Sequence, residues 1–329
     1  MKNVIITGIS GQDGSYMVDY LLENTDYNIF GAVRRLSKPN YSNFSNHLDN
    51  KRFKVVTIDL SDSQSIDNVV REVNPDYFIN FAAQSFVGSS WQIPEQTFDA
   101  GAMGVLRCLE SVRKLSPKCR FYNAGSSEEF GDVKYFPQDE KHLLSPRSPY
   151  GAAKCAARHI VKVYRESYNL FAIQGYLFNH ESPRRGEEFV TRKITKGVAR
   201  IFKAIKNEQP FEPISLGNID AMRDWGYAPD YVEAMWLMLQ QDQPDDYVIA
   251  TGETHSIREF LEIAFKTIEI SDWNKYVIQD PRMFRPAEVD VLRGDASKAR
   301  TELKWQSRTS FEDLVKKMVY SDIEIQKNK

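Results

Sequence analysis

Tyr150 and Lys154 lie four residues apart at the start of a periodic segment that predicts a helix. At that spacing the two side chains share one face of the helix, one turn apart. A nearby ammonium stabilises a phenolate, so we expect Lys154 to lower the pKa of Tyr150 from about 10 towards neutrality. Such a tyrosine could serve as a general base that takes a proton from a hydroxyl group. The same spacing also occurs in pairs that are only surface contacts.

Hydroxyl and carboxylate side chains follow a strand-like segment upstream of this pair. Residues 120–123 predict a strand, and residues 124–129 (AGSSEE) follow it. Ser126 and Glu128 are therefore expected at the edge of a sheet, although Glu128 could also be a surface carboxylate. A second carboxylate close by would raise the pKa of Glu128. On a strand or extended loop neighbouring side chains point oppositely, so we expect Glu129 to face away.

Three glycines with GxxGxxG spacing, Gly8, Gly11 and Gly14, stand between a strand-like segment at residues 4–7 and a helix-like segment. Glycines permit a tight turn and let the backbone approach a pyrophosphate, which then lies at the helix N-terminus. A structural loop could use them equally, but the strand before and the helix after favour a dinucleotide site. The contacts predicted from this loop are Gly8, Ile9, Ser10, Gly11, Gln12, Asp13 and Gly14.

The second strand-like segment ends at Arg34, where a site that prefers NAD usually carries Asp or Glu. Arginine favours a 2′-phosphate, which predicts NADP, although an arginine after a strand is also common on a solvated edge. The third strand ends at Asp59 and Leu60, placed to meet the adenine. The fourth ends in residues whose backbone could lie against the cofactor: Ala82, Ala83 and Gln84.

Short apolar runs alternate with longer amphipathic runs in the first half, which predicts the α/β class, a doubly wound, Rossmann-like parallel sheet. In such a sheet ligands bind beyond the carboxyl ends of the strands. We expect one domain at 1–177, a smaller C-terminal lobe at 178–329, and residues 219–250 rejoining the first domain. The predicted strands are 4–7, 29–33, 53–58, 77–81, 120–123 and 171–176, and the predicted helices are 15–22, 63–72, 94–115, 149–168, 189–205 and 230–239.

The composition excludes several other classes of protein. The 329 residues carry 43 Lys and Arg against 45 Asp and Glu, a net charge of −2, which does not favour a nucleic-acid binder. No stretch approaches the roughly 18 apolar residues of a membrane span, and no secretory signal is visible, so we expect a cytoplasmic protein. The three cysteines have no CxxC spacing and the histidines no HExxH, so we expect no metal site.

The order of glycine-rich N-terminus, strand-end serine and YxxxK resembles the extended short-chain dehydrogenase/reductase superfamily. Longer motifs resemble the GDP-mannose 4,6-dehydratase family more closely, over nearly the whole chain. They are residues 11–16 (GQDGSY), 83–85 (AQS), 146–151 (PRSPYG), 177–186 (LFNHESPRRG), 189–193 (FVTRK), 223–226 (RDWG), 251–254 (TGET) and 285–290 (RPAEVD).

The resemblance implies a catalytic set of Ser126, Glu128, Tyr150 and Lys154. Tyr150, assisted by Ser126, would deprotonate the C4 hydroxyl of the sugar while NADP takes the C4 hydride. Glu128 would then remove the C5 proton so that the C6 hydroxyl leaves as water, and hydride would return to C6. A plain reductase or 4-epimerase needs no such elimination base.

The resemblance also implies ligand-binding residues in both parts of the chain. The first domain would bind NADP. His180, Arg185, Tyr150 and Lys154 would contact the cofactor in addition to the residues named above. The C-terminal lobe would bind a GDP-sugar whose pyrophosphate pairs with arginines. The residues expected at the GDP-sugar are Ser85, Asn179, Lys193, Leu216, Gly217, Arg223, Arg285 and Glu288.

One loop departs from the family pattern, because residues 84–91 (QSFVGSSW) carry a Trp and lack a His that many members have. This loop borders the sugar, so a GDP-manno-heptose is an alternative substrate. A GDP-sugar 4-reductase or epimerase and a catalytically silent protein of this fold are further alternatives, against which Glu128 and the intact catalytic set argue. Residues 35–47 resemble a loop that reaches a neighbouring subunit in some members, which predicts a homodimer or homotetramer.

Overall fold

The strands of the first half of the chain form one parallel sheet. In the computed structural model, which describes residues 1–284, 289 and 291–327, seven strands pair in the order β11-β6-β5-β4-β1-β2-β3. Every neighbouring pair is parallel. The strands are β1 (Asn3–Thr7), β2 (Asn28–Val33), β3 (Phe53–Thr57), β4 (Tyr77–Asn80), β5 (Arg120–Ala124), β6 (Ala172–Leu177) and β11 (Tyr247–Ile249).

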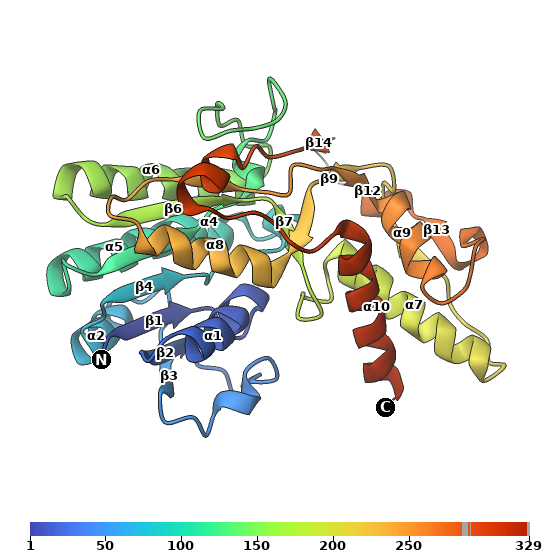
Figure 1. The fold of residues 1–329 in the computed structure, drawn as a ribbon, viewed down its shortest axis with the longest axis horizontal. Helices are drawn as coiled ribbons and strands as arrows, with labels where there is room; N and C mark the ends of the chain where they lie inside the picture. The colour runs from blue at the N-terminus through green and yellow to red at the C-terminus, as the bar shows by residue number, and fades with distance from the viewer. Residues whose placement is uncertain (285–288, 290, 328–329) are drawn as a thin grey trace.

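Helices cover both faces of this sheet, so the predicted α/β fold is confirmed (Figure 1). One apolar core lies between the sheet and a pair of helices, α1 (Gln12–Asn24) and α8 (Ala228–Gln240). A second core lies on the opposite face, under α2 (Ser63–Val73), α5 (Gly104–Leu115) and α6 (Pro149–Tyr168). β11 adds to the sheet beside β6, although it lies far along the chain.

The single helix predicted over residues 94–115 is divided in the structure. It consists of α4 (Pro94–Phe98), a π-helical turn η2 (Asp99–Met103) and α5. Arg107 bridges this region, because its guanidinium donates to the Asp99 carboxylate at 2.8 Å and to the Leu60 carbonyl at 2.9 Å. A period of 3.6 residues does not reveal a π turn, whose one-residue widening is local.

A smaller lobe packs around its own apolar core at the carboxyl end of the sheet. Its helices are α7 (Val190–Lys206), α9 (Ile257–Lys266) and α10 (Phe311–Lys327), and its short strands are β7 (Asn179–Glu181), β8 (Ile214–Leu216), β9 (Met222–Arg223), β10 (Trp225–Tyr227), β12 (His255–Ser256), β13 (Val277–Gln279) and β14 (Val291–Leu292). Short turns complete the fold: α3 (Val87–Ser90), η1 (Ser45–His47), η3 (Ser127–Glu129), η4 (Asn274–Tyr276), η5 (Pro281–Met283) and η6 (Ala299–Leu303).

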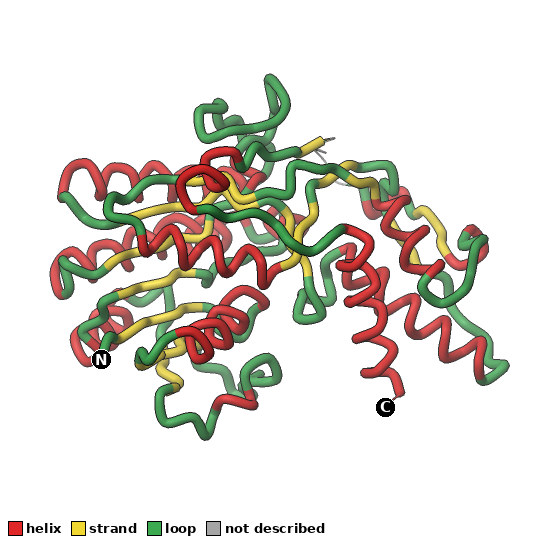
Figure 2. The backbone as a smooth tube through the Cα atoms, viewed as in Figure 1, coloured by secondary structure: helices red, strands yellow, loops and turns green. Residues whose placement is uncertain are grey.

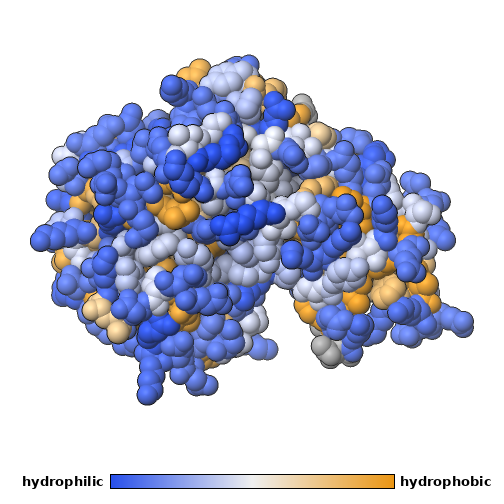
Figure 3. All heavy atoms as spheres, in the orientation of Figure 1, coloured by the Kyte–Doolittle hydropathy of each residue, from blue (hydrophilic) through white to orange (hydrophobic). Residues whose placement is uncertain are grey.

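Loops gather between the sheet and the smaller lobe, where Figure 2 shows green segments joining the yellow strands to the red helices of the lobe. The face drawn in Figure 3 is largely hydrophilic and is notched between the two parts. No helix within the described ranges has the length and apolar character needed to cross a membrane. Those ranges also contain no group of three or more His, Cys, Asp or Glu side chains that could hold a metal ion.

Candidate active site

A cavity of about 490 Å³ lies where the carboxyl ends of the strands meet the smaller lobe. Ser126, Glu128, Tyr150 and Lys154 all line it, so the structure brings the four predicted catalytic residues together. They come from two elements. Ser126 and Glu128 belong to the turn that follows β5, and Tyr150 and Lys154 lie on the first turns of α6.

Local sequence explains why these two elements meet closely. Ser148 caps α6, because its hydroxyl oxygen accepts the Gly151 amide at 3.0 Å, and Pro149 occupies the first helical position. A Cβ atom on Gly151 would lie 2.6 Å from the carbonyl oxygen of Glu128. Glycine at this position therefore lets the helix that carries Tyr150 pack against the turn that carries Glu128.

The charges around Tyr150 differ from the expectation. Burial raises the pKa of Tyr150 to about 12, partly offset by a hydrogen bond with Ser126, while the Glu128 carboxylate raises it further. The Lys154 ammonium donates to the Ala124 carbonyl at 2.6 Å and lies 5.8 Å from the centre of the Tyr150 ring. The prediction that Lys154 brings the Tyr150 pKa towards neutrality is therefore wrong for this structure, because desolvation outweighs it.

The glycine loop has the geometry of a dinucleotide site. Gly8 has φ of +71°, in the left-handed region, and a Cβ atom on Gly14 would lie 2.4 Å from the Gly8 carbonyl oxygen. A Cβ atom on Gly11 would meet only that same oxygen, at 3.3 Å, so the outer side of the turn is open. The N-cap residue Gly11 has no side chain that could cap the first amides of α1, so these amides can meet an anion. These residues fit a bound pyrophosphate.

The ends of β2 and β3 bring opposite charges near each other. Arg34 is exposed, and its charge contributes to holding the pKa of Asp59 low, although hydrogen bonds from Ser61 contribute more. The Asp59 carboxylate accepts the Ser61 amide at 2.9 Å. Arg34 is thus placed at the sheet edge without a carboxylate in the position that NAD-preferring sites use.

A buried pair ties the glycine loop to the smaller lobe. The Asp13 carboxylate lies 2.9 Å from Nε2 of His180, whose Nδ1 donates to the Phe178 carbonyl at 2.7 Å. Burial alone would lower the pKa of His180, but the Asp13 charge outweighs it and raises that pKa. Burial would likewise raise the pKa of Asp13, and the charge and hydrogen bond of His180 lower it instead.

This pair predicts a pH-dependent contribution to stability. The raised pKa of His180 stabilises the fold below its ordinary value of 6.5 and ceases to do so as the pH rises through the raised value. The lowered pKa of Asp13 stabilises the fold above its ordinary value of 3.8. We expect Asp13→Asn to lower the unfolding free energy by about 1–3 kcal/mol near pH 6, and by about 1 kcal/mol less at pH 9.

Urea-induced unfolding of both proteins at the two pH values measures this difference. An equal cost of Asp13→Asn at pH 6 and pH 9 would contradict an ion pair between Asp13 and His180.

Comparison with known proteins identifies relatives of this chain. The model of the family described as GDP-mannose 4,6 dehydratase matches residues 5–318. The chain belongs to this family. "GDP-mannose 4,6 dehydratase 1" of Arabidopsis thaliana is 48% identical, with 99% of this chain and 91% of that protein covered. GDP-mannose 4,6 dehydratase of Homo sapiens is 46% identical, with 98% and 92% covered.

The fold extends beyond the GDP-mannose 4,6-dehydratase family. A crystal structure of dTDP-glucose 4,6-dehydratase from Streptomyces venezuelae, with NAD bound, superposes with a TM-score of 0.87 at 20% identity. The superposition covers 99% of this chain and 98% of the other. The resemblance predicted from the motifs is thus confirmed at the level of family and fold.

Most of the residues that family resemblance assigned to the GDP-sugar line the same cavity. Lys193 lies at its rim, where its ammonium is 3.5 Å from the Met283 sulfur and burial lowers its pKa. Arg223 is buried, and its guanidinium donates to the Met222 carbonyl at 2.8 Å. The predicted residues found in the lining are Ser85, Asn179, Lys193, Leu216, Gly217 and Arg223, whereas Arg285 and Glu288 lie outside the described residues.

Only some of the predicted cofactor residues line this cavity. Asp13, Ala83, Tyr150, Lys154, His180 and Arg185 line the cavity. Others turn their side chains elsewhere: Ile9 and Leu60 are buried in the apolar cores, the Gln12 amide donates to the His180 carbonyl at 3.0 Å, and the Gln84 amide donates to the Phe86 carbonyl at 2.9 Å. Ile9 can therefore meet a cofactor only through its backbone.

The lining also contains aromatic and charged residues for which the sequence predicted no role. Phe86 and Phe189 pack edge to face, with ring centres 5.5 Å apart, and the Arg185 guanidinium lies 3.5 Å from the Phe189 ring centre. Buried Glu181 pairs with Arg185 at 3.1 Å. The i,i+4 spacing of Glu181 and Arg185 could have predicted their ion pair from the sequence. The aromatic contacts could not be predicted in this way, because they join segments far apart in the chain.

Proposed function

We propose that this protein is a GDP-mannose 4,6-dehydratase, which converts GDP-mannose to GDP-4-keto-6-deoxymannose and water. The observation that carries this proposal is the position of Glu128 in the same cavity as Ser126, Tyr150 and Lys154. A 4-epimerase or 4-reductase needs the serine, tyrosine and lysine, but an elimination also needs a base for the C5 proton. Family membership supports the same reaction and its GDP-mannose substrate.

The first step falls to Tyr150 and Ser126. The Tyr150 oxygen takes the proton of the C4 hydroxyl, and Ser126 hydrogen-bonds to the Tyr150 oxygen and orients it. Lys154 holds positive charge beneath the tyrosine from its position one helical turn away. A bound oxidised nicotinamide would supply a hydride acceptor for C4 and a hydride donor for C6, and its positive charge would favour the Tyr150 phenolate.

The second step falls to Glu128. Once C4 is a ketone the C5 proton is acidic, and the Glu128 carboxylate removes it. The electron pair of the C5–H bond forms the C5–C6 double bond, and the C6 oxygen leaves as water with the proton that Glu128 returns to it. Hydride addition to C6 would leave an enolate, whose C5 takes up a proton that balances the one Tyr150 took from the C4 hydroxyl. The product keeps the oxidation level of the substrate, because one carbon is oxidised and another is reduced.

We further propose that the cofactor is NADP and that it is bound mainly by residues 1–177, with the GDP-sugar bound by the smaller lobe. The open glycine turn and the uncapped amides of α1 support a dinucleotide at this end of the sheet. Exposed Arg34 supports the 2′-phosphate of NADP. The related fold solved with NAD supports a nicotinamide cofactor for the architecture in general.

Replacing Arg34 by Asp should weaken binding of NADP by about ten-fold to a hundred-fold and leave binding of NAD within about two-fold, because a charge-assisted contact to the 2′-phosphate contributes about 1.5–3 kcal/mol. Fluorescence titration of both reduced cofactors measures the two dissociation constants. Equal weakening for NADPH and NADH would show that Arg34 does not contact the 2′-phosphate. Lys51→Asp, on an exposed residue of a different segment, is the control for a general change of charge.

Mass spectrometry of the products tests the proposed reaction. Purified protein is incubated with NADP⁺ and GDP-mannose, and separately with the GDP-manno-heptose. Loss of one water from GDP-mannose without net formation of NADPH is the expected result. Loss of water only from the heptose would overturn the proposed substrate. Absence of water loss from either sugar would overturn the dehydratase assignment.

We also infer that the protein is a homodimer or homotetramer. The segment at residues 35–47 supports this, because it forms an exposed excursion between β2 and β3 that contains η1 (Figure 1). Light scattering after size-exclusion chromatography measures the molar mass against the 38.0 kDa of one chain.

A further inference from the structure

A fully buried carboxylate lies directly behind the candidate catalytic residues. The Glu129 side chain has no solvent exposure, although it neighbours the cavity-lining Glu128 in sequence. The expectation that Glu129 faces away from Glu128 agrees with its absence from the cavity lining, but the reason given for it is wrong. Both residues belong to the 3₁₀ turn η3, not to a strand or extended loop, and Glu129 points into the protein interior.

The Glu129 carboxylate is bonded to the backbone of a catalytic residue. Its Oε1 atom accepts the Ser126 amide at 2.8 Å, and the Ser126 hydroxyl in turn accepts the Glu128 amide at 3.2 Å. This reciprocal pair is a capping box, which fixes the first turn of a helix. A Cβ atom on Gly125 would lie 2.6 Å from the same Oε1, so glycine makes room for the carboxylate beneath the end of β5.

A line of buried side chains runs across the sheet and ends on Glu129. The Thr7 hydroxyl donates to Asn80 at 2.6 Å, Asn80 to Asn123 at 2.8 Å, Asn123 to Gln174 at 2.7 Å and Gln174 to Glu129 at 2.9 Å. All four donors are less than 3% exposed. Every bond donates in the same direction, so the aligned amide dipoles present their positive ends to the Glu129 carboxylate.

Thr7 immediately precedes the glycine turn of the candidate dinucleotide site. Its hydroxyl also accepts the amides of Phe81 and Ala82, at 3.2 Å and 3.1 Å. The hydrogen-bonded line therefore spans β1, β4, β5 and β6 and connects the start of the glycine loop with the turn that carries Ser126. The hydrogen bonds therefore favour a negative charge on Glu129, next to α6, the helix that carries Tyr150 and Lys154.

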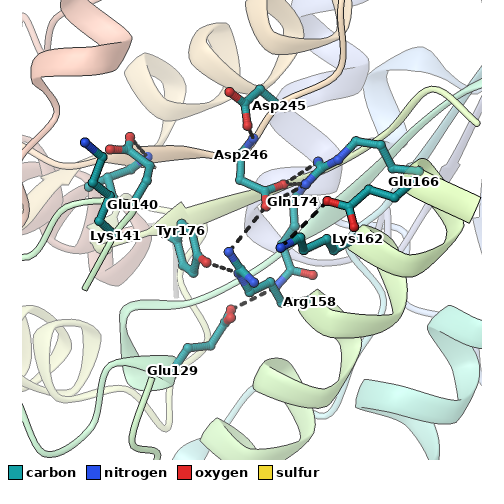
Figure 4. A network of polar contacts seen from close by, with 12 residues as sticks. Glu129, Glu140, Lys141, Arg158, Lys162, Glu166, Gln174, Tyr176, Asp245 and Asp246 are labelled. Carbon is teal, nitrogen blue, oxygen red and sulfur yellow. Dashed lines mark hydrogen bonds and ion pairs between the residues drawn. The ribbon is translucent and has the colours of Figure 1, made fainter. Parts of the chain in front are cut away.

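Cationic groups approach Glu129 mainly from α6. Lys154 and Arg158 both favour its ionised form, against burial, which raises the pKa of Glu129 to about 8. Arg158 is shared, because its guanidinium also contacts the Tyr176 hydroxyl and lies 3.7 Å from Asp246 (Figure 4). Asp13, Tyr150 and Cys155 also interact with Glu129 or with one of these two cations, and Arg165 shares the Asp246 carboxylate with Arg158.

Lys154 and Arg158 differ in the carboxylates that they meet besides Glu129: Asp13 acts on Lys154, whereas Asp246 pairs with Arg158. Burial lowers the pKa of Lys154 to about 8, and the charges of Glu129 and Asp13 oppose that effect. The ammonium itself donates to the neutral Ala124 carbonyl. Glu129 is the carboxylate that acts on Lys154 from behind the catalytic residues, while Asp246 is engaged by Arg158 and, through two hydrogen bonds, by Arg165.

We propose that Glu129 is a positioning residue of this active site, which fixes Ser126 through its backbone amide and, on the alkaline side where it is ionised, keeps Lys154 cationic through its own charge. This inference rests on the proposed dehydratase activity. It assigns a role to a residue that contacts neither the sugar nor the cofactor, because it is absent from the cavity lining. Without Glu129, Lys154 should lose its proton at lower pH, and the rate should fall on the alkaline side.

The Glu129→Gln variant separates the charge from the hydrogen bonds. Glutamine can keep an oxygen at the position of Oε1, and its amide nitrogen replaces Oε2, which has no hydrogen-bond partner among the described residues. Glu140→Gln is the matched control, because Glu140 is a partly buried carboxylate that, like Glu129, accepts a backbone amide, from Val248 at 2.7 Å, and lies outside the cavity lining. The measurement is kcat and KM for GDP-mannose between pH 6 and pH 10.

We expect Glu129→Gln to move the alkaline limb of kcat to lower pH by about one unit, which is about a ten-fold loss of rate on that limb. KM should change less than about two-fold, since Glu129 does not contact the sugar. Glu140→Gln should retain the wild-type profile. A loss of kcat of equal size at every pH, or an unchanged profile, would overturn the role of the charge, and an equal shift in Glu140→Gln would show that the effect is not local.

If Glu129→Gln fails to fold, the variants Glu129→Asp and Glu129→Asn can be compared instead. Both side chains are shorter by the same amount and leave the same unfilled space, so the two variants differ only in charge. The alkaline limb should lie at higher pH in the Asp variant than in the Asn variant, and coincident limbs would overturn the proposal. Water loss by the wild-type protein is measured first in every series. Its absence would refute the proposed function itself, whereas an active wild type with unshifted variants would refute only the role of Glu129.

Discussion

Replacing Glu128 by Gln should lower the rate of water loss from GDP-mannose by about 10²–10⁴-fold, the usual contribution of a general acid–base residue. Glutamine keeps the size of the side chain but cannot accept the C5 proton. Because Glu128 lies in the turn after β5 and not in the glycine loop, binding of NADP should change little. Binding of GDP-mannose should also remain, since the lobe residues that line the cavity are untouched.

Deuterium uptake from heavy water at sugar C5, followed by mass spectrometry, isolates the step assigned to Glu128. The variant should bind both ligands, reduce NADP⁺ at C4 and fail to exchange the C5 proton. Glu140→Gln serves as the control, because Glu140 lies outside the cavity. Undiminished C5 exchange in Glu128→Gln would remove Glu128 from its assigned role and would favour a different base.

The ends of the strands were predictable because they depend on local pattern. Apolar runs and the glycine spacing located the sheet edge, and the structure places Ser126, Tyr150 and Lys154 there together. A parallel sheet brings the carboxyl ends of its strands to one edge whatever the sequence between them. The sequence pattern could therefore predict which residues meet at the candidate site, without any knowledge of contacts between them.

The electrostatics of the site were not predictable in the same way. The spacing of Tyr150 and Lys154 suggested a depressed tyrosine pKa, yet burial raises it to about 12, and the depth of burial depends on both parts of the fold. The interior position of Glu129 depends on the turn η3, on Gly125 and on Gln174 from β6. Spacing along the chain does not contain those contacts, which arise only when the strands pair.

Replacing Tyr150 by Phe should reduce kcat by about 10²–10⁴-fold, with KM for GDP-mannose nearly unchanged, because the ring remains and only the proton-accepting oxygen is lost. With a Tyr150 pKa of about 12 in the protein alone, the phenol is protonated at neutral pH. The wild-type rate should therefore rise with pH as the phenolate becomes more populated. It should stop rising near pH 8, where Lys154, whose pKa is lowered to about 8, begins to lose its charge and offsets the gain in phenolate.

Tyr150→Phe should remove the rising limb of this pH profile, because no titrating group remains at the C4 hydroxyl. Glu128→Gln should instead slow the later elimination step, so that reduction of NADP⁺ still depends on Tyr150. Stopped-flow absorbance of reduced cofactor in a single turnover, measured from pH 6 to pH 10, separates the two variants. A rising limb that persists in Tyr150→Phe would show that another group accepts the C4 proton. Since Ser126 is the other hydroxyl that the structure places in contact with Tyr150, Ser126→Ala in the same background would then identify it.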